Sequence, residues 1–200
     1  MVEQQLRSRG VRNTRVLDAM ARVPRHEFVP EELQPEAYAD HPLPIGFGQT
    51  ISQPYVVAYM TEVLDPQPAN RVLEVGTGSG YQAAVLGELA AEVYTIEIVD
   101  TLGSRARQTL DRLGYGNVNV RIGDGYQGWP EAAPFDRIIL TAAPPALPQA
   151  LVDQLAVGGI LVAPVGPTVG GQMITIVRKT VEGVTVEETI AVQFVPMVSG

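Results

Sequence analysis

The chain has 200 residues, of which 46% are hydrophobic and 18% are charged, and it contains no cysteine. This length and apolar content indicate one globular domain with a full core and exclude intrinsic disorder, which needs few apolar residues. The net charge of −8 argues against nucleic-acid binding, and two separated histidines, His26 and His41, with no cysteine predict no disulfide, no thiolate nucleophile and no metal site.

The first 35 residues carry short apolar stripes at helical spacing, and prolines end them. The stretch 38–54 follows no clear period. Its Leu, Ile and Phe residues predict a packed loop rather than a disordered one, which makes this stretch a candidate site. Pro54 suits the first position of a helix that we expect to end near Leu64.

Strands alternate with helices from Arg71 onward. This alternation predicts an α/β fold: a doubly wound, mostly parallel Rossmann-like sheet with helices on both faces. No helix separates the last strands, so we expect an antiparallel C-terminal edge. The expected strands are 72–75, 93–98, 118–122, 137–141, 160–165, 173–177, 184–186 and 189–194, and the expected helices are about 80–90, 101–113 and 147–156.

We expect a single domain over 1–200, with N-terminal helices and an active-site loop in 1–65 and a cofactor-binding core in 66–200. The uncharged stretch from Gln154 to Val177 is long enough to cross a membrane, but its glycines and prolines favour two strands and a turn. The N-terminus has no secretion signal. The sequence therefore predicts a cytoplasmic protein, and we expect a monomer that binds neither membrane nor nucleic acid.

Three alternating glycines follow the expected strand 72–75, in the run Gly76-Thr77-Gly78-Ser79-Gly80. Glycine adopts positive φ and lets a ligand approach the backbone, and the start of the next helix offers free N–H groups to an anion. The spacing departs from G-x-G-x-x-G, which weakens a dinucleotide interpretation, and no Gly-Lys-Ser/Thr follows to make a P-loop. A tight strand-to-helix connection would also explain the run.

Carboxylates end the next two strands. Glu97 is placed to accept hydrogen bonds from both hydroxyls of a ribose. Asp124, between two glycines, can accept from the amino group of an adenine while a backbone N–H donates to a ring nitrogen. Each residue alone could be a helix cap or a surface charge. Together with the glycine turn, at three successive strand ends, they predict an adenosine-containing cofactor.

These motifs resemble the class I S-adenosylmethionine-dependent methyltransferases, and more closely the protein-L-isoaspartate (D-aspartate) O-methyltransferase family. The glycine turn is generic to the superfamily, whereas the GQTISQP and TAAP segments are specific to this family. The matching stretches, in family order over nearly the whole chain, are 45–54 (IGFGQTISQP), 73–80, 123–125, 135–144 (FDRIILTAAP), 157–166 (VGGILVAPVG) and 194–198 (FVPMV).

The resemblance implies repair chemistry, with S-adenosyl-L-methionine as cofactor and S-adenosyl-L-homocysteine as product. Such enzymes methylate the α-carboxylate of L-isoaspartyl residues, and D-aspartyl residues are a further expected substrate. The expected partners are therefore isoaspartyl-containing proteins and peptides. The resemblance places Gln49, Ile51, Glu74, Gly76, Thr77, Gly78, Glu97, Asp124 and Gly125 at the cofactor, Thr50 and Ser52 at the reaction, and Ser52, Val195, Pro196 and Met197 at the substrate peptide.

The residues agree with this chemistry. An α-carboxyl titrates near ~3.5, so the acceptor is already an anion at neutral pH and needs no general base. Thr50 and Ser52 can donate to that carboxylate while the protein aligns it and excludes water. Ser52 is a poor covalent nucleophile, because it has neither a base nor a G-x-S-x-G elbow. It could instead cap the helix that starts at Pro54.

Three alternative functions stay open. The chain could be an NAD-dependent dehydrogenase on the same fold, a related methyltransferase acting on a defined aspartate of a dedicated peptide precursor, or a non-catalytic peptide-binding relative. The segment 195–198 also has two interpretations. It could be a sheet edge, where proline blunts pairing, or it could receive an extended peptide by strand addition.

Overall fold

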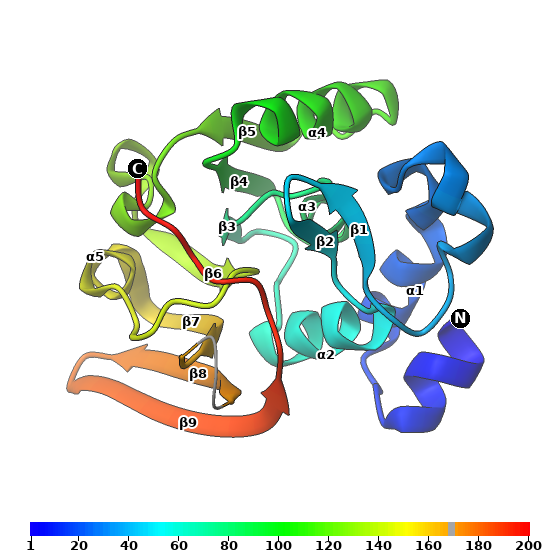
Figure 1. The fold of residues 1–200 in the computed structure, drawn as a ribbon. Coiled ribbons are helices and arrows are strands. Elements are labelled where there is room, and N and C mark those ends of the chain that lie inside the picture. Colours follow the sequence, from blue (N-terminus) through cyan, green and yellow to red (C-terminus); the bar gives the residue numbers. More distant parts are fainter. Residues whose placement is uncertain (168–170) are drawn as a thin grey trace.

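A computed structural model describes residues 1–167 and 171–200, and its centre is a seven-stranded sheet with the order β5-β4-β3-β6-β7-β8-β9 (Figure 1). The pairs among β3 to β7 are parallel, whereas β8 and β9 are antiparallel to their neighbours. The predicted fold is therefore confirmed, including its antiparallel edge. The strands are β3 (Arg71–Val75), β4 (Glu92–Glu97), β5 (Val118–Ile122), β6 (Phe135–Leu140), β7 (Leu155–Val165), β8 (Gln172–Thr180) and β9 (Gly183–Val192).

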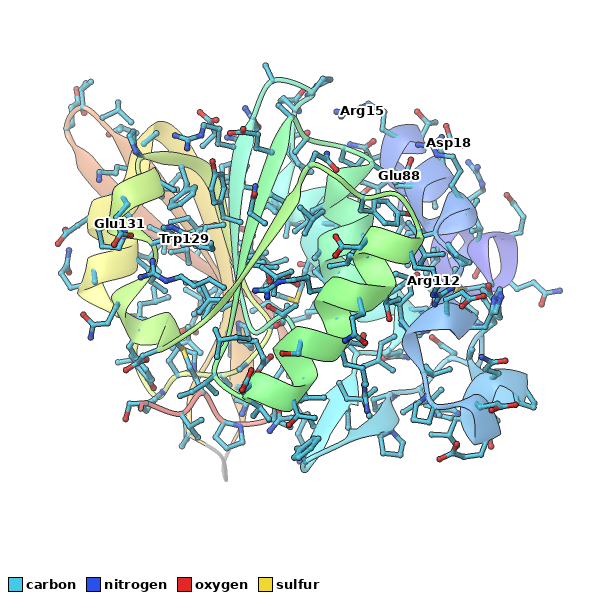
Figure 2. The ribbon with its side chains drawn as sticks, turned by 90° about the horizontal axis from the view of Figure 1, so that it is seen from above. Arg15, Asp18, Glu88, Arg112, Trp129 and Glu131 are labelled. Atoms are coloured by element: carbon cyan, nitrogen blue, oxygen red, sulfur yellow. The ribbon has the colours of Figure 1, made fainter. Side chains whose placement is uncertain are left out.

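Apolar side chains alternate along the central strands, so the sheet buries a separate cluster on each face. On β3, Val72 belongs to one cluster, and Leu73 and Val75 belong to the other. Helices α1 (Thr14–Arg22), α2 (Pro54–Leu64), α3 (Tyr81–Gly87) and α4 (Asp100–Arg112) pack on the first, and α5 (Gln149–Gln154) packs on the second. From above, Trp129 lies on the side of α5, across the sheet from α1 (Figure 2).

Only one part of the N-terminal segment is α-helix. Helix α1 begins after Asn13, whose side chain accepts hydrogen bonds from the N–H groups of Arg15 and Val16. Gly10, with a φ of 100°, ends the first turns, and Pro24 and Pro30 precede the later ones, because proline lacks the N–H that a longer helix needs. The other turns are a π-helix at Val2–Leu6 and 3-10 helices at Arg7–Arg9, Arg25–Phe28 and Glu31–Glu36.

The stretch 38–54, which we expected to be an irregular packed loop, contains an antiparallel hairpin of β1 (Leu43–Gly46) and β2 (Gln49–Ile51). Its alternation is short and is interrupted by proline and glycine, so no sequence period reveals it. At its tip Phe47 has a φ of 55° between two glycines of positive φ. Arg105 of α4 donates to the carbonyl of Ile45 at 2.7 Å and fixes the hairpin beside the sheet.

Two boundaries at the C-terminal edge also differ from expectation. Strand β7 begins at Leu155, directly after α5, rather than near Ile160. Gly158 and Gly159 weaken the strand pattern in its first half, so the sequence does not reveal this start. Strand β9 is continuous where we expected two short strands, since its exposed edge tolerates Glu187 and Glu188. The predicted turn between β7 and β8 includes 168–170, outside the described residues. Among the described helices, none is long and apolar enough to cross a membrane.

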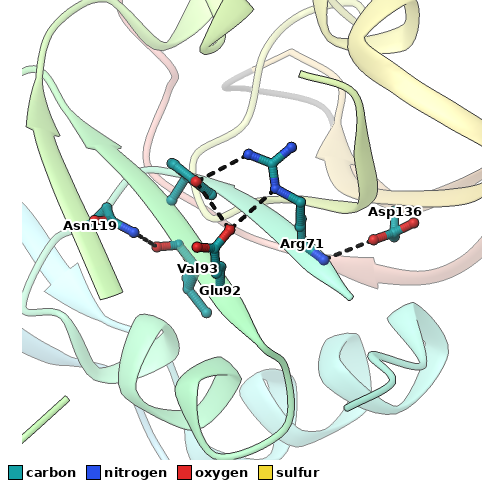
Figure 3. A network of polar contacts seen from close by, with 6 residues as sticks. Arg71, Glu92, Val93, Asn119 and Asp136 are labelled. Atoms are coloured by element: carbon teal, nitrogen blue, oxygen red, sulfur yellow. Dashed lines mark hydrogen bonds and ion pairs between the residues drawn. The ribbon is translucent and has the colours of Figure 1, made fainter. Parts of the chain in front are cut away.

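A polar network fixes the strand register at the amino ends of β3, β4 and β6 (Figure 3). The backbone N–H of Arg71 donates to Asp136 at 2.8 Å, and its guanidinium meets Glu92 at 3.3 Å. Asn119 on β5 donates to the carbonyl of Val93. Because these contacts lie at the amino ends, the carboxyl ends of the strands are left for a ligand, as is usual in open α/β sheets.

Candidate active site

A pocket lies at the carboxyl ends of β3 and β4, and the space inside it and at its open mouth is about 920 Å³. Its walls come from the β2 loop, the glycine turn, the end of β4 and the C-terminal segment 194–198. The predicted site residues that line it are Gln49, Thr50, Ile51, Ser52, Glu74, Gly76, Thr77, Gly78, Glu97, Gly125, Val195, Pro196 and Met197. The predicted residue Asp124 is not part of the lining.

The glycine turn is held firmly against the end of β4. The N–H groups of Gly76 and Thr77 both donate to the carbonyl of Ile96, at 2.8 and 3.1 Å. Gly76 has a φ of 103°, and a side chain there would collide with that of Thr141. Glycine is therefore required at this position on both conformational and steric grounds, and the backbone itself forms this part of the pocket wall.

Glu97 is fixed by two backbone donors. Its Oε2 accepts from the N–H of Gly78 at 2.7 Å, and its Oε1 accepts from the N–H of Val99 at 3.0 Å. A carboxylate oxygen can accept a second hydrogen bond, so both oxygens keep acceptor capacity while their positions are set. The structure thus brings the Glu97 carboxylate and the glycine turn together, as the strand-end pattern predicts.

Glu74 is fully buried beneath the same turn. Its Oε2 accepts from the hydroxyl of Thr95 at 2.5 Å, and that hydroxyl also meets the Thr77 hydroxyl at 2.6 Å. Its Oε1 has no partner among the described residues. Burial raises the pKa of Glu74 to about 8, and the nearby charge of Glu97 acts in the same direction. At neutral pH the side chain is therefore mostly protonated.

Asp124 lies just outside the pocket lining. Its Oδ1 accepts from the N–H of Tyr126 at 2.9 Å and caps a short 3-10 turn, while its Oδ2 accepts from the N–H of Gly200 at 3.3 Å. Its neighbour Gly125 does line the pocket. A side chain on Gly125 would collide with Val75, so only glycine lets this backbone approach β3 so closely.

The β2 loop presents two hydroxyl groups at the pocket. Neither the Thr50 nor the Ser52 hydroxyl hydrogen-bonds to another described residue, so both are available to a ligand. The interpretation of Ser52 as a helix cap is wrong, because the residue at the N-cap of α2 is Gln53, which makes no side-chain cap. Helix α2 starts at Pro54, as predicted, so Ser52 lies one residue before the N-cap position.

Arg25 anchors the β2 loop through a backbone carbonyl, a role that the sequence does not predict. Its Nη2 donates to the carbonyl of Ser52 and its Nε to that of Ala37, both at 2.7 Å. The guanidinium is 4.7 Å from the centre of the Tyr81 ring, and burial lowers its pKa. No carboxylate pairs with it within the described part of the chain. An arginine in a surface-like N-terminal segment carries no sequence signal for complete burial.

The C-terminal segment runs along the TAAP stretch rather than in the sheet. The N–H of Ala143 donates to the carbonyl of Val195 at 2.9 Å, and the N–H of Met197 donates back to Ala143 at 2.8 Å. Its interpretation as an edge of the main sheet is therefore wrong. The Pro196 carbonyl and the Val198 N–H point to the opposite side and make no hydrogen bond to any described residue.

A doubly wound sheet that carries a glycine turn, an adjoining fixed carboxylate and a hydroxyl-bearing loop over one pocket is the arrangement that the resemblance to class I S-adenosylmethionine-dependent methyltransferases implies. The sequence model of the protein-L-isoaspartate(D-aspartate) O-methyltransferase (PCMT) family matches residues 1–200. The chain belongs to this family.

Two relatives and one solved structure support this family assignment. A protein-L-isoaspartate O-methyltransferase of Synechococcus sp. is 58% identical over 99% of this chain and 84% of its own length. One of Gloeobacter violaceus is 57% identical over 98% of this chain and 96% of its own. A Plasmodium falciparum PCMT structure in complex with S-adenosyl-L-homocysteine is 26% identical, with a TM-score of 0.86, over 100% of this chain and 97% of its own.

The buried Glu74 predicts a pH-dependent stability. The folded protein keeps a proton on Glu74 up to about pH 8, whereas a glutamate of ordinary pKa loses it near 4.5. This contribution to the free energy of unfolding is complete below about pH 4.5 and is lost as the pH rises to about 8. We expect urea unfolding to show the wild type losing stability relative to Glu74→Gln over this range. A constant difference between the two proteins would contradict the prediction.

Replacing the buried arginine should destabilise the protein. Arg25→Met leaves the Ser52 and Ala37 carbonyls without donors, and the loss of such charge-assisted bonds costs about 2–4 kcal/mol in the free energy of unfolding. Arg12 is exposed and its side chain makes no hydrogen bond to a described residue, so Arg12→Met is the matched control. Equal urea midpoints for the two variants would rule out the anchoring role of Arg25.

Proposed function

We propose that this protein transfers a methyl group from S-adenosylmethionine to the α-carboxylate of L-isoaspartyl residues in damaged proteins and peptides, and that D-aspartyl residues are a second substrate. The observation that carries the proposal is the pair of free hydroxyls, on Thr50 and Ser52, at the pocket that also contains the glycine turn and Glu97. Hydroxyls can bind an anionic acceptor without removing its charge, as this reaction requires.

The pocket suits S-adenosylmethionine by its chemistry. Glu97 supplies two acceptor oxygens for the ribose hydroxyls, and the closely approached backbone at Gly76 and Gly78 suits the methionine end. Apolar side chains, including Ile96 and Met197, offer walls for a purine. Gly125 and Asp124 would meet its adenine edge. The buried Glu74 oxygen without a partner is a further polar group that a ligand can satisfy.

When bound, S-adenosylmethionine supplies an electrophilic methyl group. The residues of this chain then have three tasks. Thr50 and Ser52 donate to the acceptor carboxylate and hold its orientation. Gln49 and Ile51 close the loop over the pocket and exclude water, and Ile51 itself is buried. Val195, Pro196 and Met197 support the peptide backbone, for which the Pro196 carbonyl and the Val198 N–H are available.

No proton has to be removed from the acceptor, and the site fits that requirement. Among the described residues that line the pocket there is no histidine, and the protonated Glu74 is a poor base at neutral pH. The absence of a base next to Ser52 also disfavours a covalent serine intermediate. We further propose a cytoplasmic monomer of one domain that binds no nucleic acid, in keeping with the net charge of −8.

A methyl-transfer assay tests the proposal directly. Tritium-labelled S-adenosylmethionine is incubated with two short peptides that differ only in L-isoaspartate or L-aspartate at one position, and methanol released from the labile ester is counted. We expect label from the isoaspartyl peptide alone. Label from neither peptide, when cofactor binding is confirmed by titration, would overturn the proposal in favour of the dedicated-precursor enzyme or the non-catalytic binder.

Ser52→Ala should slow catalysis and leave cofactor affinity unchanged. A hydrogen bond to a charged group contributes about 1.5–3 kcal/mol, which corresponds to a loss of about one to two orders of magnitude in kcat/KM. Because the Ser52 hydroxyl bonds to no described residue, the fold should tolerate the change. Thr185→Ala, at an exposed hydroxyl on β9, is the control. Unchanged turnover would remove Ser52 from the mechanism.

Asp124→Asn tests the adenine contact without removing the cap. The amide oxygen can still accept from Tyr126, but the second oxygen becomes an NH₂ donor, which cannot accept from an amino group. We expect S-adenosylhomocysteine to bind about tenfold more weakly in a calorimetric titration, in line with the loss of one hydrogen bond. An unchanged Kd would show that Asp124 only shapes the turn.

A further inference from the structure

A second groove opens from the first pocket and carries no assigned role. It encloses about 1170 Å³ to its open boundary and lies between the start of α2 and the segment that follows β9. Thr50, Ser52, Thr141, Phe194 and Val195 line both spaces. The groove is therefore continuous with the place where the acceptor carboxylate is proposed to react.

The floor of the groove is apolar and firmly supported. Its side chains are half-buried, and beneath them lies the core cluster that packs against α1 to α4. Half-buried apolar groups of this kind expose a limited apolar surface while packing holds them in place. The floor residues are Tyr55, Val56, Ile190, Val192 and Phe194.

Among the described residues that line the groove, the one cation is already paired with a carboxylate. Arg9 pairs with Asp40 at 2.8 Å, and its guanidinium lies 3.7 Å from the centre of the Tyr55 ring. No other charged side chain belongs to the described lining. The groove therefore offers apolar contact, with neutral amides of Gln53 and Gln193 at its sides, and no net charge to attract an ionic ligand.

We propose that this groove binds the apolar side chain of the residue next to the isoaspartyl residue in the substrate, an inference that rests on the proposed function. An isoaspartyl residue is joined to the chain by two amide bonds, so the polypeptide has to leave the first pocket. The groove begins at Thr50 and Ser52, where the acceptor is held, and is the apolar path open to that polypeptide. Such contacts are not directional, so they favour aliphatic or aromatic neighbours as a class.

Isoaspartyl peptides with varied neighbours test the inference. The residue before the isoaspartate, and separately the residue after it, is set to Gly, Leu, Phe or Asp in otherwise identical peptides. Burial of most of a leucine side chain corresponds to about a tenfold gain in affinity. We expect Leu and Phe to raise kcat/KM about tenfold over Gly on one of the two sides, mainly through KM, and Asp to give no gain.

A variant that fills the groove tests whether the gain in kcat/KM from an apolar neighbour arises there. Ala191 is exposed and lines the groove, so Ala191→Trp can fill it without entering the core. The Leu-to-Gly ratio of kcat/KM should then fall from about ten toward one, while the Kd for S-adenosylhomocysteine stays unchanged. Val184→Trp, on the exposed part of the same strand and outside the groove, should keep the wild-type ratio.

The outcomes separate the inference from the function on which it rests. If no peptide is methylated, the proposed function fails. If all peptides are methylated with equal kcat/KM, or if Ala191→Trp keeps the wild-type ratio while remaining folded, the groove is not a side-chain site. If Ala191→Trp instead abolishes a dimer seen by sedimentation, the groove is an interface between two copies of the chain, which also overturns the inference.

Discussion

The architecture of the site depends on one buried cation. Arg25 joins three parts of the chain that are distant in sequence: Ala37 in the N-terminal segment, Ser52 in the β2 loop and Tyr81 at the start of α3. A buried guanidinium without a carboxylate partner is unfavourable unless carbonyls and an aromatic face replace the water it loses. Here the Ala37 and Ser52 carbonyls accept from Nε and Nη2 and the Tyr81 ring covers one face, whereas Nη1 has no partner among the described residues. The two carbonyl contacts fix the loop whose hydroxyls face the pocket. The N-terminal helices are thus part of the active-site structure, although they supply none of the residues that line the first pocket.

Two carboxylates that lie beside the glycine turn in space illustrate how environment separates chemically identical groups. Glu97 receives two backbone N–H donors and keeps both oxygens at the end of β4. Glu74 lies beneath the turn with one hydroxyl donor, and burial raises its pKa to about 8. The first keeps acceptor oxygens for hydroxyl donors, whereas the second places a mostly neutral polar group below the backbone. Two charged carboxylates in so small a volume would repel each other, and the protonation of Glu74 removes this repulsion.

Much of this site could be predicted from sequence because its residues follow parallel strands. Once the strand at 72–75 and its neighbours are recognised, geometry places Gly76, Glu97 and Gly125 at one edge of the sheet. The hairpin at 43–51 could not be predicted, because its alternation is short and broken by Pro44 and by the glycines at its tip. Arg25 could not be predicted either, since burial of a charge is decided by tertiary partners rather than by local pattern.

An enzyme that repairs damaged chains has to recognise a constant group within a variable sequence. The first pocket and the adjoining groove satisfy these two needs in different ways. The damaged group is the same in every substrate, whereas the sequence around it varies. Fixed hydrogen bonds are suited to the constant part, because a polar group left without its partner is strongly disfavoured and so discriminates sharply. Apolar contact is suited to the variable part, because it depends on buried area rather than on direction and tolerates many side chains. Thr50 and Ser52 lie where these two modes of recognition meet, at the wall common to both spaces. On the proposed function, this division lets one small domain be strict about the carboxylate and permissive about the protein that carries it.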